Sequence, residues 1–149
     1  FDPGGGEKVE LPVKLKVHDS VFVPLAKWAM LCTGNYRCVT SDGPRSIREA
    51  VHLDIDASRT MYDWVTAMCK TFGANDEDLV PFDKYVAAAE ILVKPSSAAR
   101  ALFAGALNIE RVDKLVQTLA SSKGMQSDVL DKIVSLVDAR LEQNRLEAN

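Results

Sequence analysis

The chain has 149 residues, of which 47% are hydrophobic and 26% are charged, and its formal net charge at pH 7 is -3. These values are close to those of an average soluble domain, and neither half of the chain is strongly basic, so we expect no nucleic-acid partner. No stretch of about 18 apolar residues occurs, so we expect no membrane partner either.

The chain opens with residues 1–7, in which Gly4, Gly5 and Gly6 stand among polar residues, and we interpret them as a flexible leader. They lack the basic and apolar run of a signal peptide, which favours a cytoplasmic or nuclear location. Residues 8–18 then alternate strictly between apolar and polar side chains. This period of two predicts a half-buried strand, and residues 21–23 are expected to be the strand that returns beside it.

A helix is predicted over residues 25–32, because Pro24 suits a first helical turn and Gly34 can end the helix. Residues 34–48 have the composition of a loop. Arg37, Arg45 and Arg48 make this loop basic. It is either an ordinary solvated loop or a contact for an acidic partner.

A third strand is predicted at residues 51–55, where apolar and acidic or polar residues alternate again. Asp56 is a suitable cap for the helix that follows. That helix has the clearest apolar stripe in the chain: Met61, Trp64, Val65, Met68, Cys69 and Phe72. After the acidic residues 75–78, a helix is expected to begin at Pro81 and to end before Pro95.

The remaining sequence predicts three helices. The first covers residues 98–106, the second is capped by Asn108 and covers residues 109–119, and the last is capped by Ser127 and covers residues 129–141. The polar residues 142–149 are expected to fray. The elements together predict an α+β protein, with a small three-stranded sheet packed on a helical cluster and a C-terminal helical extension.

No constellation of catalytic or metal-binding residues can be recognised. Cys32, Cys38 and Cys69 lack the spacing of zinc or redox motifs, and the two histidines, His18 and His52, are distant from them in sequence. No nucleophile elbow, phosphate loop or dinucleotide fingerprint occurs. We therefore predict no catalytic residue, no metal and no cofactor, and we interpret Cys32 and Cys69 as small buried apolar residues.

Residues 21–107 resemble the BTB/POZ fold, and among its members they are most similar to elongin C and to the S-phase-kinase-associated cullin adaptor. Residues 21–32 resemble the second strand and first helix of the family, and residues 51–72 resemble its third strand and long following helix. Residues 85–93, followed by residues 95–107, are similar to the family's alanine- and leucine-rich helix, short break and second helix. The resemblance implies three regions: the leader 1–7, a BTB/POZ-like core 8–107 and a C-terminal extension 108–149.

The same resemblance implies one surface for a cullin-type partner. It would lie around the long helix and the break between the next two helices, at the positions Tyr62, Thr66, Lys70, Val93, Lys94 and Pro95. We expect the first three of these side chains to be exposed.

A second candidate surface follows from helical periodicity alone. The apolar stripe of the last two helices must be buried against something. It consists of Leu115, Leu119, Ile133, Leu136, Val137 and Leu141. The stripe either folds back on its own domain, or forms a groove for a partner helix or for self-association.

These observations predict a non-catalytic adaptor for protein–protein interactions. The BTB/POZ resemblance implies that such an adaptor would link a partner to a cullin-type ubiquitin ligase. One alternative is a structural module that associates with itself. A third possibility is an enzyme of unrecognised type.

Overall fold

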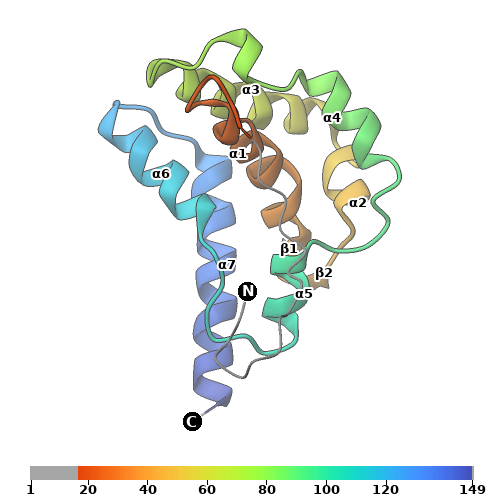
Figure 1. Ribbon diagram of the computed structural model, residues 1–149. Coiled ribbons are helices and arrows are strands. Elements are labelled where there is room, and N and C mark those ends of the chain that lie inside the picture. The colour runs from red at the N-terminus through yellow and green to blue at the C-terminus, as the bar shows by residue number, and fades with distance from the viewer. Residues whose placement is uncertain (1–16, 149) are drawn as a thin grey trace, which may run out of the picture.

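The computed structural model describes residues 17–148, which form seven α-helices and one antiparallel hairpin (Figure 1). The helices are α1 Ala26–Met30, α2 Ile47–His52, α3 Ile55–Thr71, α4 Phe82–Ala89, α5 Ser97–Phe103, α6 Val112–Ser122 and α7 Asp128–Glu147. The strands are β1 Val39–Thr40 and β2 Gly43–Pro44, and they pair Val39 with Pro44 and Thr40 with Gly43. The described part of the chain is therefore mostly helical, with a small two-stranded sheet.

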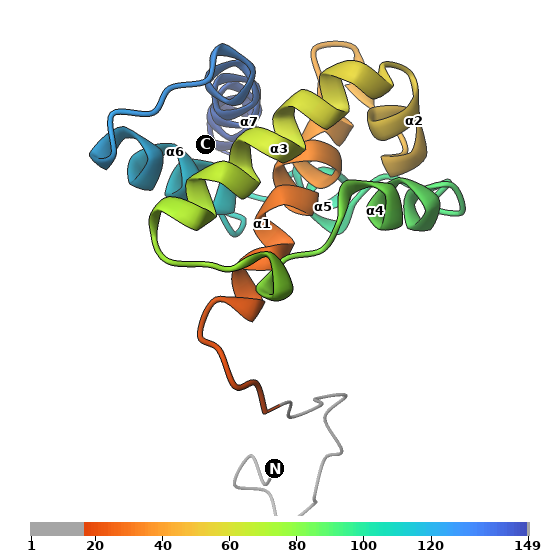
Figure 2. The same ribbon diagram turned by 90° about the horizontal axis from the view of Figure 1, so that it is seen from above.

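The centre of the molecule is a continuous helical segment of mixed geometry. A 3₁₀ turn at Val23–Leu25 leads into α1, which continues as a π-helical turn at Leu31–Asn35 and a second 3₁₀ turn at Tyr36–Cys38. This segment packs against α2, α3, α5 and α6. Figure 2 shows α3 crossing over α1, with α6 and α4 on opposite sides of it.

The core joins residues from most of these elements in one hydrophobic cluster. Its largest fully buried apolar side chains come from α2, α3, α5, α6 and α7 and include Val51, Met61, Tyr62, Met68, Leu102, Val116, Leu130 and Val137. Of the helices in residues 17–148, none combines the length and the apolar composition needed to cross a membrane.

The strand predicted at residues 51–55 is wrong, because these residues belong to α2, to the short link after it and to the first residue of α3. Ser46 caps α2 by accepting a hydrogen bond from the Glu49 amide, and the Glu49 carboxylate accepts one from the Ser46 amide in return. Val51 is buried whereas Leu53 is 73% exposed, so the alternation does not mark one buried face. The cap of α3 is Asp54 instead of Asp56, through the Ala57 amide.

The other two predicted strands have different outcomes. Most of the first, residues 8–16, lies outside the described residues, as does the predicted leader 1–7. The predicted return strand at residues 21–23 is wrong, because these residues lead into a 3₁₀ turn that places Pro24 in its first positions. The hairpin that is present lies within residues 34–48, where we predicted a loop.

The C-terminal helices follow the prediction more closely. Ser127 caps α7 as expected, whereas α6 begins after Arg111, so the expected cap at Asn108 is wrong. Fraying from residue 142 is also wrong, since α7 continues to Glu147. The buried Asn144 holds its last turns, because its side-chain amide donates to the carbonyl oxygens of Leu102 (2.8 Å) and Ala106 (2.9 Å).

Candidate interaction surface

The apolar stripe of the C-terminal helices folds back on the domain over most of its length. Ile133, Val137 and Leu141 are buried in the core that also contains α1 and α3. Leu119 and Leu136 are half-buried, and Leu115 is 45% exposed. The three buried residues are therefore covered by the domain itself. Only Leu115, Leu119 and Leu136 keep exposed surface that a partner could contact.

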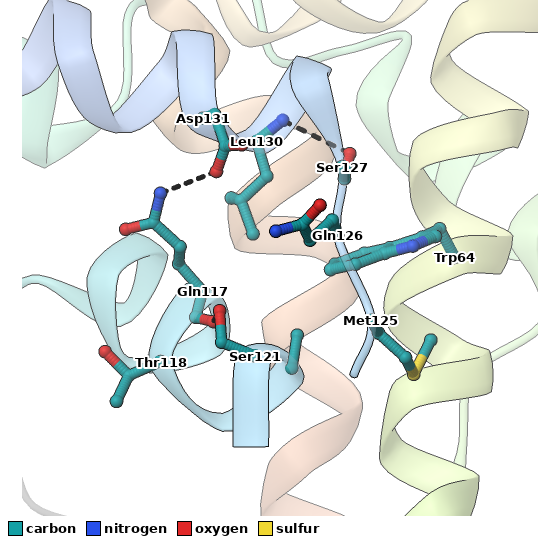
Figure 3. A pocket seen from close by; sticks show the side chains of 10 residues that line it. Trp64, Gln117, Thr118, Ser121, Met125, Gln126, Ser127, Leu130 and Asp131 are labelled. Carbon is teal, nitrogen blue, oxygen red and sulfur yellow. Dashed lines mark hydrogen bonds between the residues drawn. The ribbon is translucent and has the colours of Figure 1, made fainter. Parts of the chain in front are cut away.

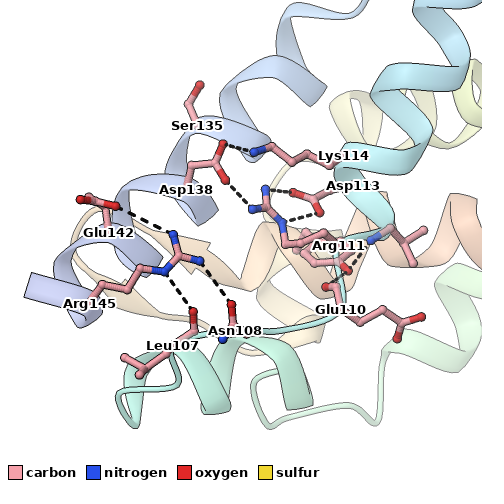
Figure 4. A network of polar contacts seen from close by, with 12 residues as sticks. Leu107, Asn108, Glu110, Arg111, Asp113, Lys114, Ser135, Asp138, Glu142 and Arg145 are labelled. Atoms are coloured by element: carbon pink, nitrogen blue, oxygen red, sulfur yellow. Dashed lines mark hydrogen bonds and ion pairs between the residues drawn. The ribbon is translucent and has the colours of Figure 1, made fainter. Parts of the chain in front are cut away.

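A polar network at the start of α6 fixes this arrangement (Figure 4). The guanidinium of Arg111 donates two hydrogen bonds to the fully buried Asp113, at 2.9 and 2.8 Å, and a third to Asp138 on α7. Lys114 also pairs with Asp138, at 2.9 Å. Burial works against the charge of Arg111, but these hydrogen bonds to carboxylates outweigh it and raise the pKa of the guanidinium above its ordinary value.

Tyr36 connects the network to the central segment. Its hydroxyl donates to the carbonyl oxygen of Glu110, at 2.6 Å, and accepts from the amide of Val112, at 2.9 Å. The amide of Val112 has no partner within α6, because it belongs to the first helical turn. The network thus supplies an acceptor to the first amide of α6 and connects the central segment to the C-terminal helices. We interpret its role as structural.

The positions assigned to a cullin-like face are not brought together. Tyr62 is only 2% exposed, so the expectation that it faces solvent is wrong. Its ring packs on Phe82 and Tyr85, and its hydroxyl donates to the carbonyl oxygen of Val80 at 2.8 Å. Thr66 is half-buried, and Lys70 is exposed and pairs with Asp76 at 2.6 Å.

Val93 and Lys94 are exposed and Pro95 is partly so, in the loop between α4 and α5. Figure 2 shows this loop and the C-terminal end of α3 at opposite ends of the molecule. The six positions therefore do not form one surface, and only the last three lie at the same site.

Those three residues belong to a larger apolar surface, which we call the 91–95 face and define as Ile91, Leu92, Val93, Lys94 and Pro95. The exposed fractions of Ile91, Leu92 and Val93 are 80%, 39% and 62%. An open groove of about 440 Å³ lies beside them. Its other lining residues are Asn35, Ile47, Ser96, Ser97 and Arg100.

Backbone hydrogen bonds hold the 91–95 face in place. The first amides of α2 donate to it, from Ile47 to the carbonyl oxygen of Lys94 (3.2 Å) and from Arg48 to that of Leu92 (3.0 Å). These amides have no partners within their own helix, so the loop supplies the acceptors that α2 needs. The exposed apolar side chains are therefore displayed by a loop that is fixed to the domain. Sequence reasoning reached Val93, Lys94 and Pro95 as surface positions but not Ile91 and Leu92, which it placed within the helix expected between Pro81 and Pro95.

A second hollow lies beside the turn between α6 and α7 and has a volume of about 290 Å³ (Figure 3). Trp64, Met125 and Leu130 contribute its larger apolar side chains. Several of its polar groups are already paired: Gln117 donates to Asp131 at 2.6 Å, and Ser127 accepts from the Leu130 amide at 3.3 Å. Asp131 is its sole titratable lining residue, so it does not offer an acid–base pair.

The three cysteines are buried and unpaired, as expected for Cys32 and Cys69. Burial raises the pKa of all three thiols, that of Cys69 to about 11. Thiols with raised pKa values are weak nucleophiles at neutral pH. Within residues 17–148, no group of three or more His, Cys, Asp or Glu side chains could hold a metal ion.

Comparison of the chain with models of protein families, with curated proteins and with solved structures found no match.

Proposed function

We propose that this protein is a non-catalytic interaction module that binds an apolar segment of a partner protein on the 91–95 face. The observation that carries the proposal is the run of exposed side chains at Ile91, Leu92 and Val93 on a loop that is fixed to α2. A contiguous apolar patch on a protein surface is characteristic of interaction sites.

The energetics favour a partner that covers this face. Full burial of an isoleucine or valine side chain stabilises by about 1.5–3 kcal/mol relative to its exposed state. Ile91 and Val93 can contribute most of that amount, because they are largely exposed and their backbone is already ordered. Lys94 and Arg100 stand at the edge of the groove and are exposed, so carboxylates that flank the apolar side chains of the partner would be favourable there.

The BTB/POZ resemblance supports a more specific form of the proposal. If the chain is an adaptor of that kind, the 91–95 face overlaps the cullin-like surface at Val93, Lys94 and Pro95, and the partner belongs to a cullin-type ubiquitin ligase in the cytoplasm or nucleus. Tyr62, Thr66 and Lys70 would have a smaller part in such a contact, because of their burial or their position.

Affinity purification from the native cells with mass spectrometry tests the proposal. The Ile91→Asp/Val93→Asp variant is compared with the wild-type chain and with Leu146→Asp, a control at a side chain that is 68% exposed on α7. We expect the first variant to lose a partner that the wild type and the control both retain. Equal recovery of every partner by all three proteins would contradict the proposal.

Light scattering of the purified chain at micromolar concentration distinguishes the self-associating alternative. A monomer agrees with an adaptor. A dimer that the Ile91→Asp/Val93→Asp variant abolishes would assign the same face to a second copy of this chain instead.

A further inference from the structure

A basic groove lies between the β1–β2 hairpin and α7. Arg37, Arg45 and Lys132 contribute its cations. The other lining residues are Val39, Thr40, Ser41, Val129, Ile133 and Leu136, and the volume is about 380 Å³. No acidic residue lines it. The groove combines the basic loop and the C-terminal apolar stripe, two features that the sequence analysis treated separately.

Neutral groups hold the two arginine side chains in place. Arg37 donates from Nη1 to the hydroxyl of Ser58, at 2.6 Å, and to the carbonyl oxygen of Thr33, at 3.3 Å. Arg45 donates from Nε to the carbonyl oxygen of Arg37, at 2.7 Å. Both guanidinium groups are therefore oriented before any ligand arrives, which lowers the entropic cost of binding.

Within the described chain, the carboxylates that act on the arginines of the groove do so without forming an ion pair: Asp54 acts on Arg37, and Glu49 acts on Arg45. Among residues 17–148, Arg37, Arg45 and Lys132 form no ion pair with a carboxylate. Burial and the neighbouring charge of Arg45 lower the pKa of Arg37, against the weaker opposing effect of Asp54. An anion bound between the two arginines would relieve this repulsion.

The groove also has a large apolar component. Val129 is 44% exposed, Leu136 is half-buried, and Val39 and Ile133 complete the apolar lining. An inorganic anion would neutralise the cations but would leave the exposed parts of Val129 and Leu136 uncovered, whereas Val39 and Ile133 are already buried. A nucleic acid would meet only three cations on a chain of net charge -3. A peptide with both carboxylate and apolar side chains complements both parts of the groove.

We propose that this groove is a second docking site, which binds an acidic segment of a partner protein. The segment places one or two Asp or Glu carboxylates against Arg37, Arg45 and Lys132, and an apolar side chain against Val129 and Leu136. The groove shares no lining residue with the groove at the 91–95 face. The chain thereby gains a second surface, which an adaptor needs in order to hold two partners.

Selection of a phage-displayed library of random dodecapeptides on the full chain tests this proposal. The selected peptides are then synthesised, and their affinities are measured for the wild type, for Lys132→Glu and for Arg45→Glu/Lys132→Glu. Lys27→Glu is the matched control, since Lys27 is exposed on α1 and does not line the groove. The side chain of Lys132 makes no hydrogen bond or ion pair within residues 17–148, so its variant should retain the fold.

We expect the selected peptides to be rich in Asp or Glu with interspersed Leu, Ile or Val. Their affinity should fall at least about tenfold in Lys132→Glu, fall further in the double variant and remain unchanged in Lys27→Glu, and it should weaken with added salt. Selection of neutral or basic peptides, no selection at all, or equal binding to wild type and Lys132→Glu would overturn the proposal. The Ile91→Asp/Val93→Asp variant should bind these peptides with the same affinity as the wild type. Such a result would show that the peptides bind at this groove and not at the 91–95 face.

Discussion

Gly34 illustrates how a single residue sets the packing of the core. It lies in the π-helical turn, and a Cβ added there would stand 2.0 Å from the hydroxyl oxygen of Tyr85. That hydroxyl donates to the carbonyl oxygen of Met30 at 3.1 Å, so it is held in place. Gly34→Ala should therefore lower the free energy of unfolding by about 1–3 kcal/mol, which urea denaturation can measure.

Tyr85→Phe provides the control, because it removes the nearest of the atoms that an alanine at position 34 would meet. The Gly34→Ala/Tyr85→Phe variant should be more stable than the sum of the two single changes implies. Strict additivity would show that the contact between Gly34 and Tyr85 does not limit the packing there.

Asp138 makes the attachment of α7 sensitive to acid. Partial burial works against its charge, but hydrogen bonds from Arg111 and Lys114 outweigh this effect and hold the pKa of Asp138 below its usual 3.8. A carboxyl group with a lowered pKa stabilises the fold at pH values above 3.8, and this contribution is lost as the pH falls through the folded-state pKa. Since the side chain is 41% exposed, screening limits the contribution to about 1 kcal/mol or less.

The Asp138→Asn variant tests this effect. Its deficit in unfolding free energy relative to wild type should be present at about pH 7 and should be smaller at about pH 2.5, because this contribution declines as the pH falls below 3.8. A deficit that is the same at both pH values would show that the ionised carboxylate contributes nothing.

At the scale of elements, helices with a sustained apolar period could be predicted from sequence, and short alternating segments could not. The stripe from Met61 to Phe72 is confirmed as α3, and Ser127 caps α7 as expected. Residues 51–55 show only three apolar positions in alternation, a pattern that a short helix and its link can also produce. The pair Ser46 and Glu49, which forms a capping box, was the sequence signal that favoured a helix there.

A buried amide, that of Asn144, connects the C-terminal part of α7 to the end of α5 and the residues after it, beside the contacts of Arg145 with Leu107 and Asn108. Asn144→Ala would remove the side-chain donor from the carbonyl oxygens of Leu102 and Ala106, and the Leu102 oxygen would keep the Gly105 amide, at 3.1 Å. We expect a loss of about 1–3 kcal/mol in stability. Hydrogen–deuterium exchange should become faster in the last turns of α7. The matched control is Gln143→Ala, at an exposed position, which should leave exchange there nearly unchanged.

At the scale of the whole molecule, a nearly neutral charge conceals a local separation of charge. Arg37 and Arg45 line the groove beside α7, whereas Arg48 pairs with Glu90 beside the 91–95 face. The sequence indicated a basic loop but could not reveal that Lys132, almost ninety residues further on, completes the groove. That juxtaposition depends on how α7 packs against the hairpin, which is a property of the tertiary structure.

The candidate interaction surfaces could also be predicted only in part from the sequence. Periodicity identified the stripe at Ile133, Val137 and Leu141, but it could not decide whether the domain itself or a partner covers those residues. The core covers them, so the apolar surface that we propose as the docking site lies elsewhere, at Ile91 and Val93. The BTB/POZ resemblance and a link to a ubiquitin ligase stay predictions.

The central claim is that a partner covers the 91–95 face, and hydrogen–deuterium exchange of the chain with and without a captured partner tests it most directly. We predict slower exchange on binding at residues 91–95 and in the first turn of α2, whose amides bond to that loop. The Ile91→Asp/Val93→Asp variant should show no such change. Protection confined to other parts of the chain, with residues 91–95 unaffected in the wild-type complex, would contradict the claim.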